Sequence, residues 1–312
     1  MSRAAAADTE GPWTTRRLLQ WTTGFLTERQ VDSARLCAEL LLSHVLGCER
    51  TRLYMEADRP ASPTELARLR ELVKRAGAHE PVQYLVGETW FHARSFLVDR
   101  STLIPRPATE TLVGLAVEWA RPRGQPLRML DLCTGSGCIA VSVAAALTTP
   151  RKGWAEAPAP PVETSVVASD LVPAAVDLAR RNAERHGQAS RVEFRVGDLF
   201  GALAADERGA FDLVTANPPY VSDAEWSACE PNVRDHEPVT ALRGGPDGLR
   251  LIEPLLRDAA TWMAPGGRLL VEIAASQGER VRRMTQASPG LRFVQVAKDH
   301  EGLDRVLVAD RA

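Results

Sequence analysis

The stretch Asn217-Pro218-Pro219-Tyr220 ends an apolar run that begins at Phe211. A tight turn needs only one Pro or Gly, whereas two prolines remove two backbone donors and leave their carbonyls free to accept. The Asn217 side-chain oxygen and the Pro218 carbonyl suit the two hydrogens of a planar NH2 group, on which Tyr220 would pack. Gripping both hydrogens would draw electron density toward the nitrogen as a methyl group arrives. The stretch therefore predicts a catalytic loop for amino-group methylation, the alternative being a loop that is merely stiffened by proline.

A glycine-rich segment forms a second candidate site, in the stretch "LDLCTGSGCIA". It follows an apolar strand and opens a helix, which is where open α/β sheets bind ligands. Glycines there allow a ligand to approach the backbone closely. Ala140 takes the place of the third glycine of the dinucleotide fingerprint, and no basic residue is present to meet a pyrophosphate. A tight strand-to-helix turn is the structural alternative. The predicted contacts are Gly135 and Gly137, whereas Cys133 and Cys138, which flank the loop without partner ligands, read as small packing residues.

Two acidic residues follow the next two predicted strands. Asp170 is placed to bind ribose hydroxyls, although it could instead cap the following helix. Asp198 could accept from the exocyclic amine of an adenine, with Leu199 and Phe200 over its ring, or could be an ordinary loop carboxylate. A glycine loop and two acids suit a nucleoside without phosphates, namely S-adenosylmethionine, better than NAD. Asn217, at the fourth strand end, is expected to border this cofactor as well.

The elements that position these residues alternate between strand and helix from Leu127 onward. This alternation predicts an α/β protein with a mostly parallel sheet covered by helices on both faces. The last two strands, within residues 291–310, read as an antiparallel hairpin at or near a sheet edge. A small helical domain precedes the sheet, with Ser62 as a helix cap and Pro63 at the first helical position.

The predicted organisation has four parts. Residues 1–11 form a disordered tail, 12–80 a helical substrate-binding domain, 81–107 a hairpin or linker, and 108–312 the catalytic domain. The segment 82–107 is expected to contain short β-like runs. Residues 148–164, rich in Pro and Ala, are expected to form a surface insertion.

Composition excludes several classes of protein. The chain of 312 residues has a net charge of −2, and this balance argues against a protein that wraps nucleic acid. Its five cysteines lack disulfide-like spacing, its six histidines lack metal-ligand spacing, and no apolar run approaches the ~20 residues that span a bilayer. We expect a cytoplasmic monomer with no metal, no membrane contact and no direct nucleic-acid partner.

Several segments resemble the HemK/PrmC family of protein-(glutamine-N5) methyltransferases, which modify peptide-chain release factors. They are "EPVQYLVG", "TLIPRPATETLV", "LDLCTGSGCIA", "ASDLVPAAVDLARRNAERHG", "ANPPY" and "VRDHEPVTALRGGPDGLRLIEPLL". The resemblance covers nearly the whole chain and implies a Rossmann-like methyltransferase fold with S-adenosylmethionine as cofactor. It implies a helical domain that grips the release factor, and a target glutamine in a Gly-Gly-Gln loop that reaches Asn217. It gives Arg106 and Glu110 a structural or channel-lining role. The residues that it implies for the cofactor pocket are Cys133, Thr134, Gly135, Ser136, Gly137, Asp170 and Leu199.

Two departures from the family pattern stand out. One is the long segment 148–164. The other is Ala274, where the family often has glycine, and this alanine is expected to alter the packing near the site slightly.

Two other functions stay open at this point. One is an amino-group methyltransferase acting on adenine N6 or guanine N2 in nucleic acid, whose loops are similar. The other is a non-catalytic module that binds a translation factor, against which the intact Asn217–Tyr220 loop argues.

Overall fold

The computed structural model describes residues 11–149 and 161–312, and its contacts divide the chain into two units. The first comprises the chain up to Gly87 together with Pro231–His236, and the second the remainder. The expected tail lies almost entirely outside the described residues, as does most of the expected insertion, 148–164. Within the described ranges, no helix is long and apolar enough to cross a membrane, and no disulfide joins any of the five cysteines.

The first unit is helical. Amphipathic α1 and α4 place leucines on a shared core with α2, and that core includes Leu26 and Leu41, both fully buried. Ser62 caps α4 in a reciprocal capping box with Glu65, and Pro63 occupies the first helical position, as expected. Its helices are α1 (Thr15–Glu28), α2 (Ala34–Leu46), α3 (Arg50–Met55), α4 (Pro63–Ala76), α5 (Val82–Val86) and α10 (Pro231–Arg234).

The segment 82–107 is only partly as predicted. Residues Val82–Val86 form the short helix α5 rather than a β-like run, and Gly87 ends it in the left-handed conformation. Val82 and Leu85 lie in the core of the helical unit, so the burial of that apolar face outweighs the β preference of the valines. The expected hairpin follows, with β1 (Glu88–Phe91) antiparallel to β2 (Arg94–Leu97).

The second unit is built on a seven-stranded sheet of order β10-β11-β9-β6-β3-β4-β5. Strands β3, β4, β5, β6 and β9 run parallel, and β11 runs antiparallel between β9 and β10. The predicted fold class, with its C-terminal antiparallel hairpin, is therefore confirmed. The strands are β3 (Leu127–Leu132), β4 (Thr164–Asp170), β5 (Val192–Val196), β6 (Phe211–Ala216), β9 (Met263–Glu272), β10 (Leu291–Lys298) and β11 (Asp304–Arg311).

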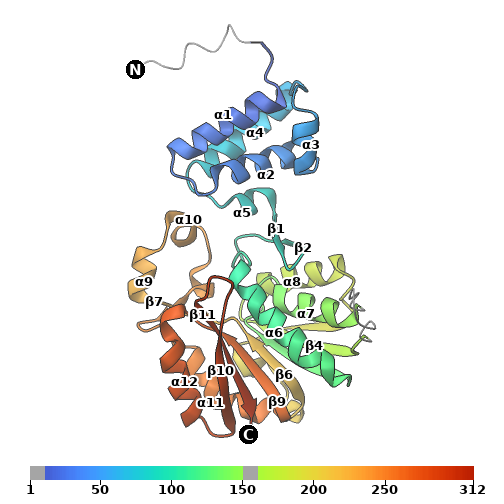
Figure 1. Cartoon of the computed structure of the whole chain (residues 1–312), viewed down its shortest axis with the longest axis vertical. Helices are drawn as coiled ribbons and strands as arrows, with labels where there is room; N and C mark the ends of the chain where they lie inside the picture. The colour runs from blue at the N-terminus through green and yellow to red at the C-terminus, as the bar shows by residue number, and fades with distance from the viewer. Residues whose placement is uncertain (1–10, 150–160) are drawn as a thin grey trace. The chain divides into compact units, whose positions relative to one another are not determined.

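Helices cover both faces of this sheet (Figure 1). Alternate strand residues separate two apolar cores, so Met129 packs on one side of β3 and Leu130 on the other. The first core contains residues of α6 (Glu110–Ala120), α7 (Cys138–Thr148) and α8 (Pro173–Arg185). The second contains residues of α11 (Ile252–Trp262) and α12 (Gly278–Ala287). Smaller elements are α9 (Asp223–Ala228), β7 (Val221–Ser222) and β8 (Arg243–Gly245).

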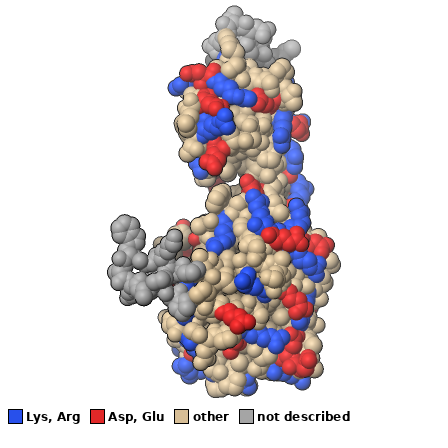
Figure 2. Space-filling model, turned by 90° about the vertical axis from the view of Figure 1, so that its right-hand side faces the viewer, with Lys and Arg blue, Asp and Glu red and all other residues tan. Residues whose placement is uncertain are grey.

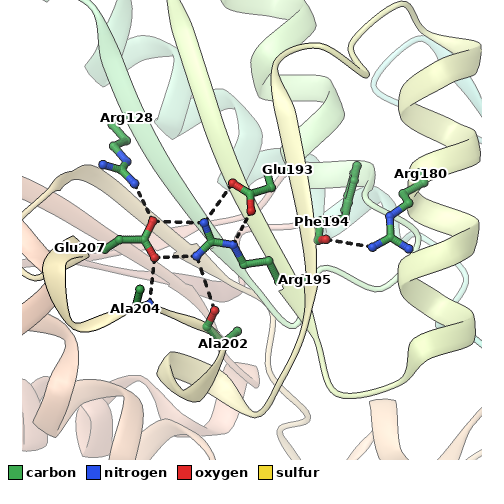
Figure 3. Close-up of polar contacts among 8 residues, drawn as sticks. All are labelled: Arg128, Arg180, Glu193, Phe194, Arg195, Ala202, Ala204 and Glu207. Atoms are coloured by element: carbon green, nitrogen blue, oxygen red, sulfur yellow. Dashed lines mark hydrogen bonds and ion pairs between the residues drawn. The ribbon is translucent and has the colours of Figure 1, made fainter.

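An ionic network ties a connecting turn to the sheet (Figure 3). Glu207, in the turn after β5, accepts from Arg128 of β3 at 2.6 Å and from Arg195 of β5. Arg195 also contacts Glu193 at 2.7 Å, so its guanidinium lies between two carboxylates. Arg128 and Arg195 are both paired with carboxylates of this cluster. We therefore interpret the cluster as a structural contact that stabilises the sheet.

Candidate functional site

A cavity of about 400 Å³ opens at the carboxyl ends of β3, β4, β5 and β6. This is the edge of a parallel sheet where ligands bind, and the volume falls within the usual range for small-molecule sites. All of its lining residues belong to the second unit. Of the predicted site residues, the cavity is lined by Cys133, Thr134, Gly135, Ser136, Asp170, Asp198, Leu199, Asn217 and Pro219.

The glycine loop leaves β3 with its backbone in the left-handed region at Cys133, Gly135 and Gly137. Nothing lies within 4 Å of a Cβ added at Gly135, so the cavity reaches the bare backbone there. Gly137 has a different role and does not line the cavity. A Cβ added there would lie 3.1 Å from the Cβ of Ala179, so this glycine allows α7 and α8 to pack closely. Cys133, a non-glycine residue at φ 57°, carries strain of the kind that concentrates at functional sites.

A fully buried carboxylate, Asp131, supports the loop from below. It accepts from the hydroxyls of Thr134 and Thr215, both at 2.6 Å, and so links the glycine loop to β6. Burial raises the pKa of Asp131 to about 6, although these two hydrogen bonds oppose the shift. Nothing in the sequence pattern singled out this residue, because a polar residue inside a strand gives no sign of what it faces.

Asp170 ends β4 with its carboxylate at the cavity. Its two oxygens accept backbone N–H groups from Gly135 at 2.8 Å and Val172 at 3.0 Å. Burial raises its pKa, against the opposing effect of those hydrogen bonds. The two roles predicted for Asp170, capping and ligand binding, are therefore compatible. Its carboxylate accepts from the backbone at the start of α8, and it also lines the cavity. Each carboxylate oxygen retains lone-pair capacity for a ligand hydroxyl.

The end of β5 contributes Asp198 and Leu199, but the expectation for Phe200 is wrong. Phe200 is buried and stacks on Trp262, with ring centroids 5.9 Å apart, and it does not line the cavity. The left-handed backbone of Leu199, at φ 44°, turns successive side chains to different sides. Leu199 consequently reaches the cavity while Phe200 enters the core.

The Asn217–Tyr220 loop leaves β6 at the same edge. Asn217 lines the cavity, and its Nδ2 donates to Thr109 Oγ1 at 3.4 Å. Pro218 and Pro219 are buried, which fixes the loop against the protein. Among the hydrogen bonds of the described residues, none occupies the Pro218 carbonyl. Pro218 itself is not among the cavity-lining residues, so the gripping of an NH2 group by Asn217 and the Pro218 carbonyl stays a prediction.

Tyr220 does not line the cavity either. Its hydroxyl donates to Glu272 Oε1 at 3.0 Å, and burial, reinforced by the charge of Glu272, raises its pKa. Gln277 holds the same residue from the other side, since its Nε2 donates to the Tyr220 carbonyl at 3.1 Å. In this structure Tyr220 braces the loop, and its packing on a substrate stays a prediction.

Several lining residues escaped the sequence analysis. The segment before α6 provides one of them, Thr109. It also provides Arg106, for which the family resemblance implied a structural or channel-lining role, and which pairs with the buried carboxylate of Glu237. The loops around β8 add Thr240 and Arg250. These residues come from segments far apart in the chain, and each has an ordinary local sequence, so only the fold could bring them to one cavity.

Two other expectations can be compared with the structure. Burial raises the pKa of the Cys133 thiol well above its usual range and that of Cys138 to about 12, so both thiols stay neutral, although both also line the cavity. Ala274 has an extended backbone, with φ −68° and ψ 147°, which does not require glycine. Its N–H donates to Gln277 Oε1 at 3.0 Å, so the substitution leaves the local hydrogen bonding complete.

Comparison with known proteins agrees with this architecture. Residues 17–87 match the model of the PrmC N-terminal domain, and residues 125–305 match that of a methyltransferase domain. A release factor glutamine methyltransferase of Geobacter sulfurreducens is 41% identical, over 96% of this chain and 98% of the relative. One from Rhodopirellula baltica is 36% identical, over 99% of this chain and all of the relative.

A solved structure described as a release factor-specific protein-(glutamine-N5) methyltransferase, from Alicyclobacillus acidocaldarius, is 27% identical. The match covers 69% of this chain and 99% of the chain in that structure, with a TM-score of 0.38. The assignment rests on the sequence relatives, which match this chain over almost its whole length and theirs. The predicted resemblance is thereby confirmed: the chain belongs to the family of release factor glutamine methyltransferases.

Proposed function

We propose that this protein transfers a methyl group from S-adenosylmethionine to the side-chain amide nitrogen, N5, of the glutamine in the Gly-Gly-Gln motif of peptide-chain release factors. The observation that supports the proposal is the Asn217–Tyr220 loop, whose Asn217 lines a nucleoside-sized cavity and directs its Nδ2 to Thr109. The near full-length similarity to named release factor methyltransferases supports the same substrate.

The lining residues fit the cofactor. Gly135 leaves open space beside the backbone, and Asp170 presents a partly buried carboxylate suited to ribose hydroxyls. Asp198 adds a second acceptor, and Leu199 and Ile139 provide apolar surface for a flat ring. When bound, S-adenosylmethionine supplies a methyl group made electrophilic by its sulfonium sulfur. The proposed cofactor contacts are thus Cys133 to Ser136, Asp170, Asp198, Leu199 and Asn217.

The chain's own residues orient and polarise the substrate amide. Asn217 Oδ1 and the Pro218 carbonyl each accept one N–H of the glutamine side chain, which fixes the nitrogen and favours its pyramidal form. The bound cofactor would supply the methyl group, so that the nitrogen–carbon bond would form as the cofactor's carbon–sulfur bond breaks. One amide proton is then released to water, because neither the neutral Asn217 amide nor a backbone carbonyl is a strong base.

The helical unit is proposed to bind the release factor, and the protein to act in the cytoplasm as a monomer, without direct contact to nucleic acid. The match of residues 17–87 to the PrmC N-terminal domain supports a role specific to this family. Acidic and basic side chains are mixed over the face in Figure 2, without the extended basic surface that nucleic-acid binding would favour.

Isotopically labelled S-adenosylmethionine tests the proposal directly. The purified protein is incubated with a release factor, with the same factor whose Gly-Gly-Gln glutamine is replaced by alanine, or with a pool of RNA and DNA. We expect label on the intact factor alone. Label on nucleic acid alone, or equal label on both versions of the factor, would contradict the proposal.

A further inference from the structure

A second loop, residues 243–249, borders the Asn217–Tyr220 loop. Its sequence, Arg-Gly-Gly-Pro-Asp-Gly-Leu, contains three glycines. The two segments adjoin because β7 pairs in parallel with β8, and the Val221 N–H donates to the Leu242 carbonyl at 2.9 Å. No residue of the 243–249 loop is among those that line the cavity. Any effect of this loop on the reaction must therefore act through its neighbours.

Two glycines of the 243–249 loop allow its backbone to approach carbonyls of the neighbouring loop. A Cβ added at Gly244 would lie 2.6 Å from the Pro219 carbonyl oxygen. A Cβ added at Gly248 would overlap the Tyr220 carbonyl oxygen and lie 2.5 Å from Gln277 Nε2. Non-bonded atoms do not pack this closely, so a larger side chain at either position would displace one loop from the other.

The side chain of Gln277 joins the two loops. Its Nε2 donates to the Tyr220 carbonyl at 3.1 Å and to the Asp247 carbonyl at 3.4 Å. Its Oε1 accepts the N–H of Ala274 at 3.0 Å, and this contact fixes the amide with its donor end toward both loops. Gln277 is 6% exposed, so water does not readily replace these hydrogen bonds.

The 243–249 loop is itself held by hydrogen bonds and one ion pair. The Asp247 carboxylate accepts the Leu249 N–H at 3.2 Å and pairs with Arg280 of α12 at 2.6 Å. The Arg250 N–H donates to the Gly244 carbonyl at 3.0 Å. The loop is thereby anchored, and it provides a fixed support for the backbone beside it.

We infer that Gly248 and Gln277 are positioning residues that fix the Tyr220 carbonyl and, with it, the backbone of the Asn217–Tyr220 loop. Gln277 holds this carbonyl, and the absence of a side chain at Gly248 leaves the space in which the two groups meet. The inference rests on the proposed function, in which Asn217 and the Pro218 carbonyl hold the target amide. Precise support matters there because a displacement of about 1 Å near a reacting group can lower the rate about 10²-fold.

Gly248→Ala tests the close approach, with Gly266→Ala as its matched control. Both glycines have a left-handed backbone, at φ 74° and 72°, but nothing lies within 4 Å of a Cβ added at exposed Gly266. The two alanines share the backbone strain, and only the steric overlap differs. We expect Gly248→Ala to lower kcat by about 10²-fold, with the Kd of S-adenosylhomocysteine nearly unchanged, and Gly266→Ala to keep the wild-type kcat. Equal kcat in the two variants, or a loss mainly in the Kd, would overturn the inference.

A measurement without substrate follows the Tyr220 carbonyl itself. Tyr220–Val221 is the only Tyr-Val pair in the sequence, so carbonyl-¹³C tyrosine and ¹⁵N valine together give a single NMR signal for this peptide bond. Gln277→Met removes the donor at similar side-chain length, and we expect the carbonyl resonance to move upfield, as it does when a hydrogen bond is lost. The control Gln286→Met, at an exposed position on α12, should leave the resonance in place. An unchanged resonance in folded Gln277→Met protein would overturn the inference.

Turnover of the same variants completes the test. Gln277→Met should lower kcat without a matching change in the Kd of S-adenosylhomocysteine, and Gln286→Met should change neither. A moved carbonyl resonance with an unchanged kcat would overturn the positioning role. If the wild type fails to label a release factor, the proposed function fails, while the NMR result still shows whether Gln277 holds the Tyr220 carbonyl.

Discussion

The two halves of the cavity are assembled in different ways. The half formed by the ends of β3, β4 and β5 is held largely by hydrogen bonds between consecutive strand ends, such as Gly135 N–H to Asp170. The half formed by the end of β6 depends on side chains from distant segments, including Thr109 before α6, Glu272 on β9 and Gln277 after it. We call the first the cofactor half and the second the substrate half, after the molecules proposed to bind there. Because different side chains hold them, a substitution should be able to impair cofactor binding or substrate binding separately.

The largest effect is expected for a substitution at Asn217, which should impair turnover but not cofactor binding. We expect Asn217→Ala to lower kcat by about 10³-fold, because it removes one of two acceptors for the substrate amide. Cofactor affinity, measured by calorimetry, should change little. A large loss of cofactor affinity would show that Asn217 belongs mainly to the cofactor half.

The next prediction concerns the support of the cofactor half. Fully buried Asn182 on α8 donates to the carbonyls of Leu97 and Ser136 and accepts the Leu97 N–H at 2.7 Å. Asn182→Ala leaves these backbone groups unpaired and should lower the free energy of unfolding by about 3 kcal/mol. Urea denaturation measures this loss, with exposed Glu184→Ala on the same helix as the control, expected within about 0.5 kcal/mol of wild type. Equal losses in both would contradict the structural role of Asn182.

The raised pKa of Asp131 should make the free energy of unfolding depend on pH. Its pKa in the folded state is about 6, against a reference of 3.8, so the folded protein binds this proton more tightly than the unfolded chain. The free energy of unfolding should therefore fall by about 3 kcal/mol from this group as pH rises from about 4 to above 6. Asp131→Asn should lack that contribution. Urea midpoints of both proteins across this range test it, and parallel pH profiles would contradict the assignment.

The smallest effect is expected at Asp170. Asp170→Asn keeps the side-chain size, but its amide nitrogen would oppose one of the two backbone donors, Gly135 N–H or Val172 N–H. We expect about a tenfold weaker cofactor affinity, typical of a lost charged hydrogen bond, with kcat at saturating cofactor nearly unchanged. Asp177→Asn, at an exposed position on α8, is the control. A dominant loss in kcat would show that the two halves are coupled.

The same contrast explains what could be predicted from the sequence. A short window of sequence contains the signals for several features. Local periodicity gives the order of strands and helices, turn residues indicate the glycine loop, and the position after a strand indicates Asp170. Thr109, Glu272 and Glu237 have no such local pattern, because their roles depend on which strands become neighbours. The helix at Val82–Val86 and the buried Phe200 were predicted incorrectly for a related reason, since tertiary burial decided both.

The most direct test of the account is the chemical position of the methyl group. Tandem mass spectrometry of a release factor after incubation with the protein and S-adenosylmethionine locates it within the peptide. The account predicts a single methyl group on the side-chain amide nitrogen of the Gly-Gly-Gln glutamine. A methyl group on any other residue, or on a carboxylate, hydroxyl or amine of the factor, would contradict it.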